Sequence, residues 1–173
     1  MARKPVNLLA RAAGTTAGAL LLLASAAAPA LAEAAPAAPS AAPSVCYRAH
    51  VESIGWQGWT CDGNLAGTTG RSLRLEALEI RASGVGRLCA QAHVEKMGWQ
   101  ATRCANDGDT LSVGTTGQYL RMEGLVLGVS TGNVCANAHM AHTGWQGLRC
   151  GGSVFVGETG QHARIEGITI NVG

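Results

Sequence analysis

Six cysteines and three regularly placed histidines are the residues of this chain best suited to chemistry. Each histidine follows one cysteine by four residues, and a second cysteine follows the first by fifteen. The cysteine pairs are Cys46 and Cys61, Cys89 and Cys104, and Cys135 and Cys150. Thiols and imidazoles together could bind zinc, but thiolate zinc sites usually contain C-x-x-C pairs, and none occurs in this sequence. The equal spacing instead predicts one disulfide inside each of three equivalent units.

The histidines themselves, His50, His93 and His139, could form a three-histidine metal site if they converged on one axis. Hydrophobic alternation argues against that arrangement. Small apolar residues such as Ala49 and Ala92 occupy the opposite face of the same strands, and that face suits the axis better. A strand histidine bonded to a neighbouring side chain is the commoner case, so we predict neither a metal site nor a cofactor.

Four tryptophans could contact a ligand. An indole face can stack on a sugar ring, and an adjacent glutamine amide supplies a donor and an acceptor. The candidate ligand contacts are Trp56, Gln57, Trp59, Trp99, Gln100, Trp145 and Gln146. The three repeated indoles could instead fill the core, and we favour this interpretation because the chain has only one Phe and two Tyr for that purpose. Trp59, which occurs once, is the better candidate for exposure.

An Arg-x-Glu pair also recurs three times. The pairs are Arg74 and Glu76, Arg121 and Glu123, and Arg164 and Glu166. Acid catalysis needs a carboxyl group with a raised pKa, whereas an adjacent guanidinium keeps the carboxylate ionised. A structural ion pair or a turn-capping role explains the threefold recurrence better. Because the sequence contains no P-loop or H-E-x-x-H motif either, we predict that the protein is not an enzyme.

These repeated residues divide the chain from Val45 onward into three repeats, at residues 45–83, 88–130 and 134–173. Each reads C-x-x-x-H-x-x-x-x-G-W-Q, then a cysteine, G-[TE]-T-G and R-[LMI]-E-[AG]-[LI]. Its first strand alternates apolar and polar residues, which is typical of a half-buried β-strand. We therefore predict a single all-β domain of three repeats with pseudo-threefold symmetry. A β-prism-like arrangement is favoured, and a β-trefoil is the alternative.

Two further features refine the repeat. The apolar phase of its last strand shifts by one residue, at Ala77, Gly124 and Gly167, which predicts a β-bulge. The segment between its second cysteine and the G-[TE]-T-G string varies in length, so we expect a surface loop there.

The N-terminal segment predicts export. Residues 1–32 combine a positive start, an apolar run and a small-residue cleavage site, as in a secretory signal peptide. Residues 33–44 read as an Ala/Pro linker. The expected location is extracellular, either secreted or associated with the cell wall, and disulfides are the usual state of cysteines there.

The charge of the chain excludes one class of partner. The formal net charge is +2, from 13 Lys and Arg against 11 Asp and Glu. Without residues 1–32 only 10 basic residues remain against 11 acidic ones, so the domain lacks the basic surface of a nucleic-acid-binding protein. No second apolar segment follows, so no membrane span is predicted after signal removal.

The repeat strings resemble the clostridial hydrophobic W (ChW) repeats of bacterial surface and secreted proteins. The resemblance rests on the Gly-Trp, G-T-T-G and R-x-E elements in fixed order, and it covers nearly all of residues 45–173. It implies a non-catalytic module for extracellular binding or attachment. The paired cysteines and Glu158 depart from the usual pattern, and Thr102 and Leu148 replace the second tryptophan, Trp59, in repeats 2 and 3.

Two functions are consistent with these features. The first is recognition of an extracellular protein or glycan, with several equivalent patches. The alternative is a disulfide-stabilised structural or inhibitor-type secreted protein that acts through a loop. The insertion at residues 105–113 in repeat 2 is the candidate loop. The sequence makes no prediction of the oligomeric state.

Overall fold

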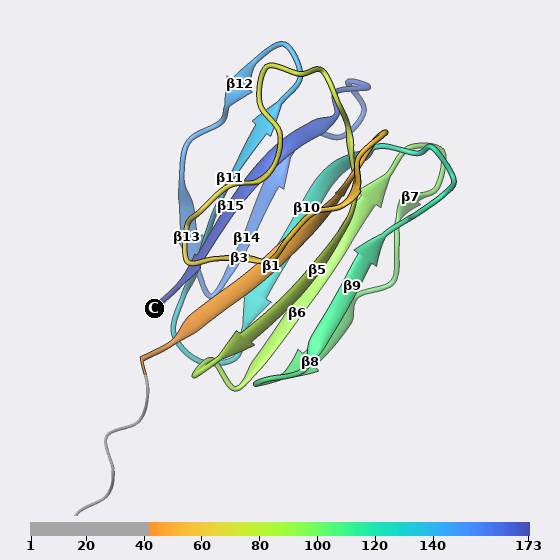
Figure 1. Ribbon diagram of the computed structural model, residues 1–173. Helices are drawn as coiled ribbons and strands as arrows, with labels where there is room; N and C mark the ends of the chain where they lie inside the picture. The colour runs from red at the N-terminus through yellow and green to blue at the C-terminus, as the bar shows by residue number, and fades with distance from the viewer. Residues whose placement is uncertain (1–41) are drawn as a thin grey trace, which may run out of the picture. The chain divides into compact units, whose positions relative to one another are not determined.

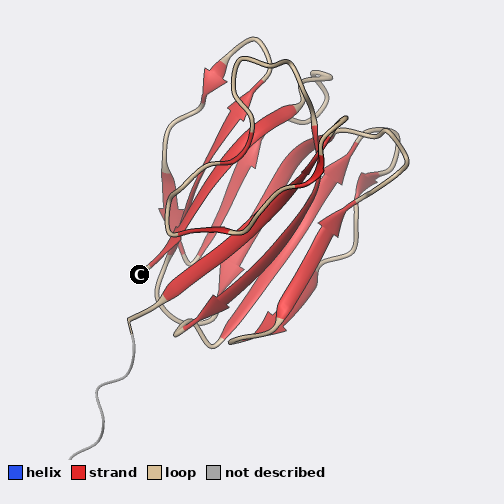
Figure 2. Ribbon diagram, viewed as in Figure 1, coloured by secondary structure: helices blue, strands red, loops and turns tan. Residues whose placement is uncertain are grey.

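Residues 42–173, the part of the chain that the computed structural model describes, contain fifteen β-strands and no helix (Figures 1 and 2). The all-β prediction is therefore confirmed. Within these residues there is accordingly no helix with the length and apolar character needed to cross a membrane. The predicted signal peptide and residues 33–41 of the predicted linker lie outside the described residues.

Each repeat contributes five strands. In repeat 1 these are β1 (Ser44–Val51), β2 (Gly55–Trp56), β3 (Thr60–Cys61), β4 (Ala66–Gly67) and β5 (Leu75–Ser83). In repeat 2 they are β6 (Arg87–Val94), β7 (Gly98–Trp99), β8 (Arg103–Asn106), β9 (Thr110–Gly114) and β10 (Met122–Val129). In repeat 3 they are β11 (Val134–Met140), β12 (Gly144–Trp145), β13 (Arg149–Gly151), β14 (Ser153–Gly157) and β15 (Ile165–Val172).

The strands form three antiparallel sheets of the same topology. Their orders are β2-β1-β5-β9, β7-β6-β10-β14 and β12-β11-β15-β4, and β3, β8 and β13 pair with the first long strand of their own repeat. Three separate sheets around one core, without a closed barrel in the described residues, match the β-prism-like prediction better than the β-trefoil alternative.

Each sheet includes one strand from another repeat. Strand β9 of repeat 2 completes the sheet of repeat 1, β14 of repeat 3 completes that of repeat 2, and β4 of repeat 1 completes that of repeat 3. We call this arrangement the cyclic strand exchange. Because the last exchange returns to the first repeat, it closes the domain, and the C-terminus lies near the start of β1 (Figure 1).

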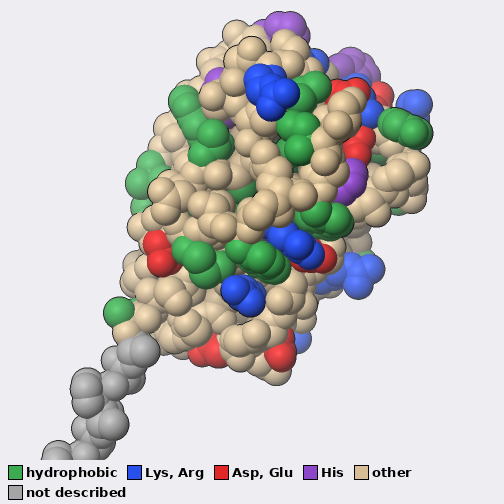
Figure 3. Space-filling model, viewed as in Figure 1, with side chains coloured by type: hydrophobic (Ala, Val, Ile, Leu, Met, Phe, Trp, Pro, Cys, Tyr) green, Lys and Arg blue, Asp and Glu red, His purple; other side chains and the backbone are tan. Residues whose placement is uncertain are grey.

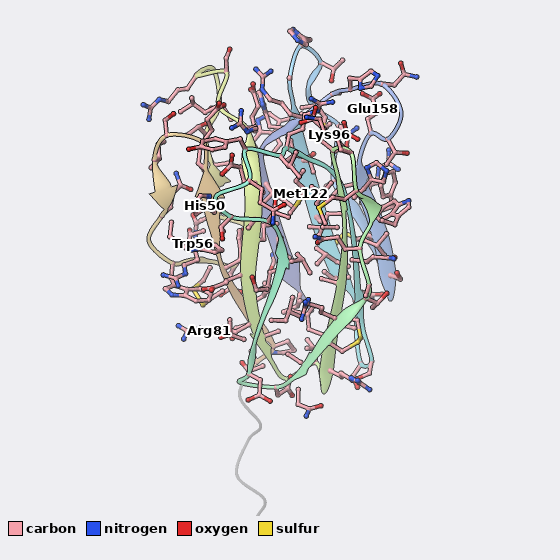
Figure 4. All side chains as sticks on the ribbon, turned by 90° about the vertical axis from the view of Figure 1, so that its right-hand side faces the viewer. His50, Trp56, Arg81, Lys96, Met122 and Glu158 are labelled. Carbon is pink, nitrogen blue, oxygen red and sulfur yellow. A yellow bond between two sulfur atoms is a disulfide. The ribbon has the colours of Figure 1, made fainter. Side chains whose placement is uncertain are left out.

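The predicted alternation sets which face of each sheet is buried. In β1 every second residue from Val45 to Val51 is fully buried, and β6 and β11 follow the same pattern. The small residues Ala49, Ala92 and Ala138 lie in this core, as expected for closely approaching sheets. Leucine, isoleucine, valine and methionine fill the remaining space, and Figure 4 shows Met122 between the sheets.

Tyr47 is the one large aromatic side chain in this core, at a position where repeats 2 and 3 have alanine. Its hydroxyl donates to the carbonyl oxygen of Asn64 and accepts from the backbone N–H of Ile170 at 2.8 Å. In the other two repeats the residues equivalent to Ile170 pair with a five-residue exchanged strand, whereas β4 has only two residues. The phenol therefore replaces a missing part of the strand. Burial raises the pKa of the Tyr47 hydroxyl above its ordinary value of 10.0.

The predicted β-bulges are present. The strand register shifts at the glutamate of each Arg-x-Glu pair, one residue before the predicted positions. The extra residues are Glu76, Glu123 and Glu166. Because a bulge re-aims the strand, these glutamates become buried, with 4–5% of each residue exposed.

The predicted disulfides are also present. They join Cys46 to Cys61, Cys89 to Cys104 and Cys135 to Cys150, and each closes a loop with a sequence separation of 15. Each links directly paired residues of neighbouring strands. In the chain-entropy account a loop of this length contributes about 3 kcal/mol.

Candidate functional site

The three repeated tryptophans lie on the outer side of the sheets, so the interpretation that they fill the core is wrong. Trp99 and Trp145 are each 43% exposed, Trp59 is 36% exposed and Trp56 is half-buried. The hairpin after each first strand pairs the tryptophan with the histidine of the polar face, as His50 pairs with Trp56 (Figure 4). Directly paired residues share a face of the sheet, so the indole is directed away from the core.

A histidine supports each of these indoles edge-on. The ring centroids of His50 and Trp56 are 5.3 Å apart at an interplanar angle of 80°, and repeats 2 and 3 have nearly the same geometry. The Nδ1 atom of His50 lies 3.0 Å from Oε2 of Glu76. The equivalent distances in repeats 2 and 3 are 3.1 and 3.4 Å.

The buried glutamate is held in turn by the arginine two residues before it, as the Arg-x-Glu pattern predicts. Arg74 Nε donates to Glu76 Oε1 at 2.9 Å, and the pairs in repeats 2 and 3 match it. Each repeat thus contains a chain of contacts from arginine through glutamate and histidine to the exposed indole. We call it the relay. The guanidinium compensates the negative charge of the buried carboxylate.

The glutamine next to each repeated tryptophan bonds to backbone. Gln57 Nε2 donates to the carbonyl oxygen of Gly67 at 3.1 Å, and its Oε1 accepts from the N–H of Gly67 at 2.7 Å. Gln100 and Gln146 make the same pair of bonds with Gly114 and Gly157. These amides therefore fix the exchanged strand, and the tryptophans are left as the candidate ligand contacts.

The first glycine of each G-[TE]-T-G string lies where the relay of one repeat meets the exchanged strand of another. Gly114 has a φ of +92°, and a Cβ atom on it would lie 2.4 Å from the carbonyl oxygen of Glu76. Gly67 and Gly157 are in the same situation against Glu166 and Glu123. Only glycine fits this close approach. The next residue donates its N–H to the same carbonyl oxygen, and Glu158 does so at 2.8 Å just as threonine does in the other repeats.

Repeat 1 carries an additional aromatic and cationic surface. The guanidinium of Arg48 lies 5.1 Å from the ring centroids of both Trp56 and Trp59, and that of Arg81 lies 4.6 Å from Trp59. Arg48 also pairs with Glu79 at 2.7 Å, whereas no ion pair in the described residues includes Arg81. None of these residues except Trp56 recurs in repeats 2 and 3, so the three repeats present different surfaces.

The corresponding surfaces of repeats 2 and 3 lack these two arginines. Phe155 of the exchanged strand β14 packs edge-on against Trp99, with ring centroids 5.9 Å apart. In repeat 3, Leu148 takes the position of Trp59 and is 64% exposed. On the face shown in Figure 3, basic side chains are scattered among acidic and hydrophobic ones.

The insertion of repeat 2 differs from the surface loop that the sequence suggests. Residues 110–113 belong to strand β9, which pairs with β5 over its whole length. Leu111 and Val113 are buried in the core. Only a tight turn at residues 107–109 remains outside the strands, so the inhibitor-type alternative has no protruding loop at this place.

A G-x-S-x-G string occurs at residues 128–132. In hydrolases this motif places a nucleophilic serine between a strand and a helix. Here the turn joins two strands, β10 and β11. The hydroxyl of Ser130 accepts from the N–H of Arg87 at 2.9 Å and donates to the carbonyl oxygen of Val85 at 3.0 Å. This serine stabilises the junction between repeats.

The candidate site of each repeat is thus a partly exposed indole beside a relay whose glutamate is buried, on a disulfide-stabilised three-sheet β domain. Among residues 42–173 no group of three or more His, Cys, Asp or Glu is arranged to hold a metal ion. The fold and these sites define a class of repeat-built β domains with surface tryptophans.

A family model described as ChW, Clostridial hydrophobic W, matches residues 50–84 and 93–129. Repeats 1 and 2 therefore match this family, as the sequence resemblance predicts. Repeat 3 lies outside the matched residues and has the same sheet topology. No curated protein and no solved structure gives a significant match to the chain.

Proposed function

We propose that the protein is a secreted, non-catalytic module that binds an extracellular protein or glycan through its surface tryptophans. One observation carries this proposal: equivalent indoles in three repeats stay partly exposed although the histidine of a relay packs edge-on against each of them. A large aromatic side chain held rigidly at the surface offers contact area at little cost in conformational entropy. The family match supports a binding-type module.

The three repeats give the proposal a further property. Because one rigid domain carries all three indole sites, a repetitive polymer or a multimeric protein can occupy several sites at once. The second and third contacts then form intramolecularly, which raises the overall affinity without new contacts. Three disulfides suit an oxidising compartment, in agreement with an extracellular location.

Binding to a glycan array and to purified cell-wall material tests the proposal. The variants are Trp56→Leu, Trp59→Leu, Trp99→Leu and Trp145→Leu, alone and combined. Buried aromatic contacts at interfaces often contribute about 2 kcal/mol or more, so loss of a contacting indole should weaken binding at least about thirtyfold. Tyr119→Leu, which removes an aromatic side chain that is 78% exposed and lies outside the relays, is the matched control.

Two results would count against the proposal. One is a folded protein that retains neither a glycan nor a protein from the tested material. The other is a combined tryptophan variant that binds as tightly as the unmodified chain.

A further inference from the structure

Repeats 1 and 2 each satisfy the relay arginine with a second carboxylate. Glu52 forms an ion pair with Nη1 of Arg74 through Oε1. Glu95 Oε1 lies 2.7 Å from Nη1 of Arg121. These glutamates are two residues after the relay histidine, at the end of the first strand. Each of these arginines therefore binds two carboxylates, one of them buried and one at the surface.

Repeat 3 has Ala141 at this position. Its backbone keeps the same place, because the N–H of Ala141 donates to the carbonyl oxygen of Arg164 at 2.9 Å, as Glu52 and Glu95 do to their arginines at 3.0 Å. Among the described residues, Arg164 forms an ion pair only with Glu166. The Arg164 side chain is 26% exposed, compared with 18% for its two equivalents. Arg164 thus lacks the second carboxylate.

Arg121 and Arg164 also each lie beside a residue of another repeat, and this residue covers Arg164 of repeat 3 less than it covers Arg121 of repeat 2. Nη2 of Arg121 lies 3.2 Å from Nδ1 of His162, which belongs to repeat 3. The residue equivalent to His162 beside Arg164 is Ser72 of repeat 1, whose side chain is much shorter. Two independent substitutions, at residues 141 and 72, therefore leave space at the same arginine.

A cavity of about 340 Å³ occupies this space. Its lining includes Arg164, His139, His142, Ser72 and Glu166. The turn residue equivalent to His142 is serine in repeat 1 and lysine in repeat 2. The lining therefore combines one guanidinium and two imidazoles with a single carboxylate, which Arg164 and His139 already contact. Hydrogen bonds from a guanidinium to a carboxylate are among the stronger polar contacts in proteins.

We propose that this cavity binds a carboxylate group of a ligand, in the place that the glutamate side chain occupies in repeats 1 and 2. The chain itself provides the template, since the same arginine position binds a carboxylate in both other repeats. His139 lines the cavity and also packs edge-on against Trp145, so the cavity and that indole share one histidine. The cavity is a separate site from the indoles, and the inference does not require the tryptophan-based function.

Titration of the isotope-labelled, disulfide-bonded protein, followed by amide NMR shifts, tests this inference. The probes are methyl glucuronide, N-acetylaspartate and the neutral methyl glucoside. We expect at least one of the two carboxylates to shift amides near residues 70–72 and 139–144 in a saturable way, and the neutral sugar to leave them unchanged. Comparing the two carboxylates distinguishes a sugar acid from a peptide carboxylate as the source.

The decisive variant is Ala141→Glu, which restores the carboxylate of the other repeats and should fill the cavity from within. It should weaken carboxylate binding by about tenfold or more, the equivalent of one charged hydrogen bond. Ala101→Glu, an exposed site in repeat 2, is the control with the same change in charge and should leave the affinity unchanged.

Three outcomes would overturn the inference. They are equal affinity in the Ala141→Glu variant, equal binding of the neutral sugar, and the absence of saturable shifts with both carboxylates while the protein remains folded. None of them bears on the tryptophan variants, so failure here is distinguishable from failure of the proposed function.

Discussion

The substitution Tyr47→Phe removes a single oxygen atom from the junction where repeat 3 meets repeat 1. The hydroxyl group donates a hydrogen bond to the carbonyl oxygen of Asn64 and accepts one from the N–H group of Ile170, and the tyrosine is fully buried. Phenylalanine preserves the ring and its packing but leaves both backbone groups without this partner. A buried polar group without a partner costs about 1–3 kcal/mol, so we expect the free energy of unfolding to fall by about that amount.

Urea denaturation with the disulfides intact measures this loss. The midpoint should decrease while the denaturant slope stays constant, because the surface exposed on unfolding does not change. The chain has one other tyrosine, and Tyr119→Phe makes the same chemical change at a side chain that is 78% exposed. Its effect should stay below about 0.5 kcal/mol. Equal midpoints for the two variants would refute the role assigned to the Tyr47 hydroxyl.

The pH dependence of stability provides a second readout of the same hydroxyl. Burial raises the pKa of Tyr47 in the folded state above its ordinary value of 10.0, so the unfolded chain loses this proton first as the pH rises. The stabilisation is therefore fully present below pH 10.0 and is lost as the pH rises through the folded-state pKa. Absorbance titration of the Tyr119→Phe variant observes Tyr47 alone. An ordinary pKa in that titration would contradict the argument.

Three other substitutions test the architecture of the repeats. Gly117→Ala should cost about 1–2 kcal/mol, because residue 117 has a positive φ although the space around it is open. Gly114→Ala should cost more, because a Cβ atom at residue 114 would also collide with backbone atoms. Equal shifts in the thermal unfolding of the two variants would contradict this. Gln100→Ala removes two bonds to the exchanged strand and should cost about 1–3 kcal/mol in urea denaturation. Joint replacement of Cys89 and Cys104 by alanine should cost about 3 kcal/mol in the same assay, and an unchanged midpoint would exclude a stabilising bridge.

Much of the fold can be predicted from residue types and spacing. Regular intervals between cysteines give the disulfides, and the alternation from Val45 to Val51 gives the buried face of the first strand. The cyclic strand exchange cannot be predicted in this way. Strand β4 has only two residues, and the five residues of β9 alternate equally well for either neighbouring sheet. Only packing in three dimensions selects the partner.

The tryptophan site is less well predicted, although the necessary signal is present in the sequence. The scarcity of aromatic residues suggests a core position for Trp56, yet a hairpin turn pairs it with His50, which alternation places on the polar face. Cross-strand pairing therefore outweighs composition. The buried position of Glu76 is harder to foresee, because a bulge interrupts the alternation at that residue. The bulge, more than any single side chain, creates the relay.

The cyclic strand exchange has a consequence for how many repeats a chain can usefully contain. A fragment with only repeats 1 and 2 would keep β4 with no sheet to complete, and its second sheet would lack β14. The unpaired exchanged strand of one fragment could then pair with the incomplete sheet of another. Such fragments should therefore associate until the total number of repeats in the assembly is divisible by three. Since β1 and β15 are in contact, a circularly permuted chain that starts at repeat 2 should fold to the same domain.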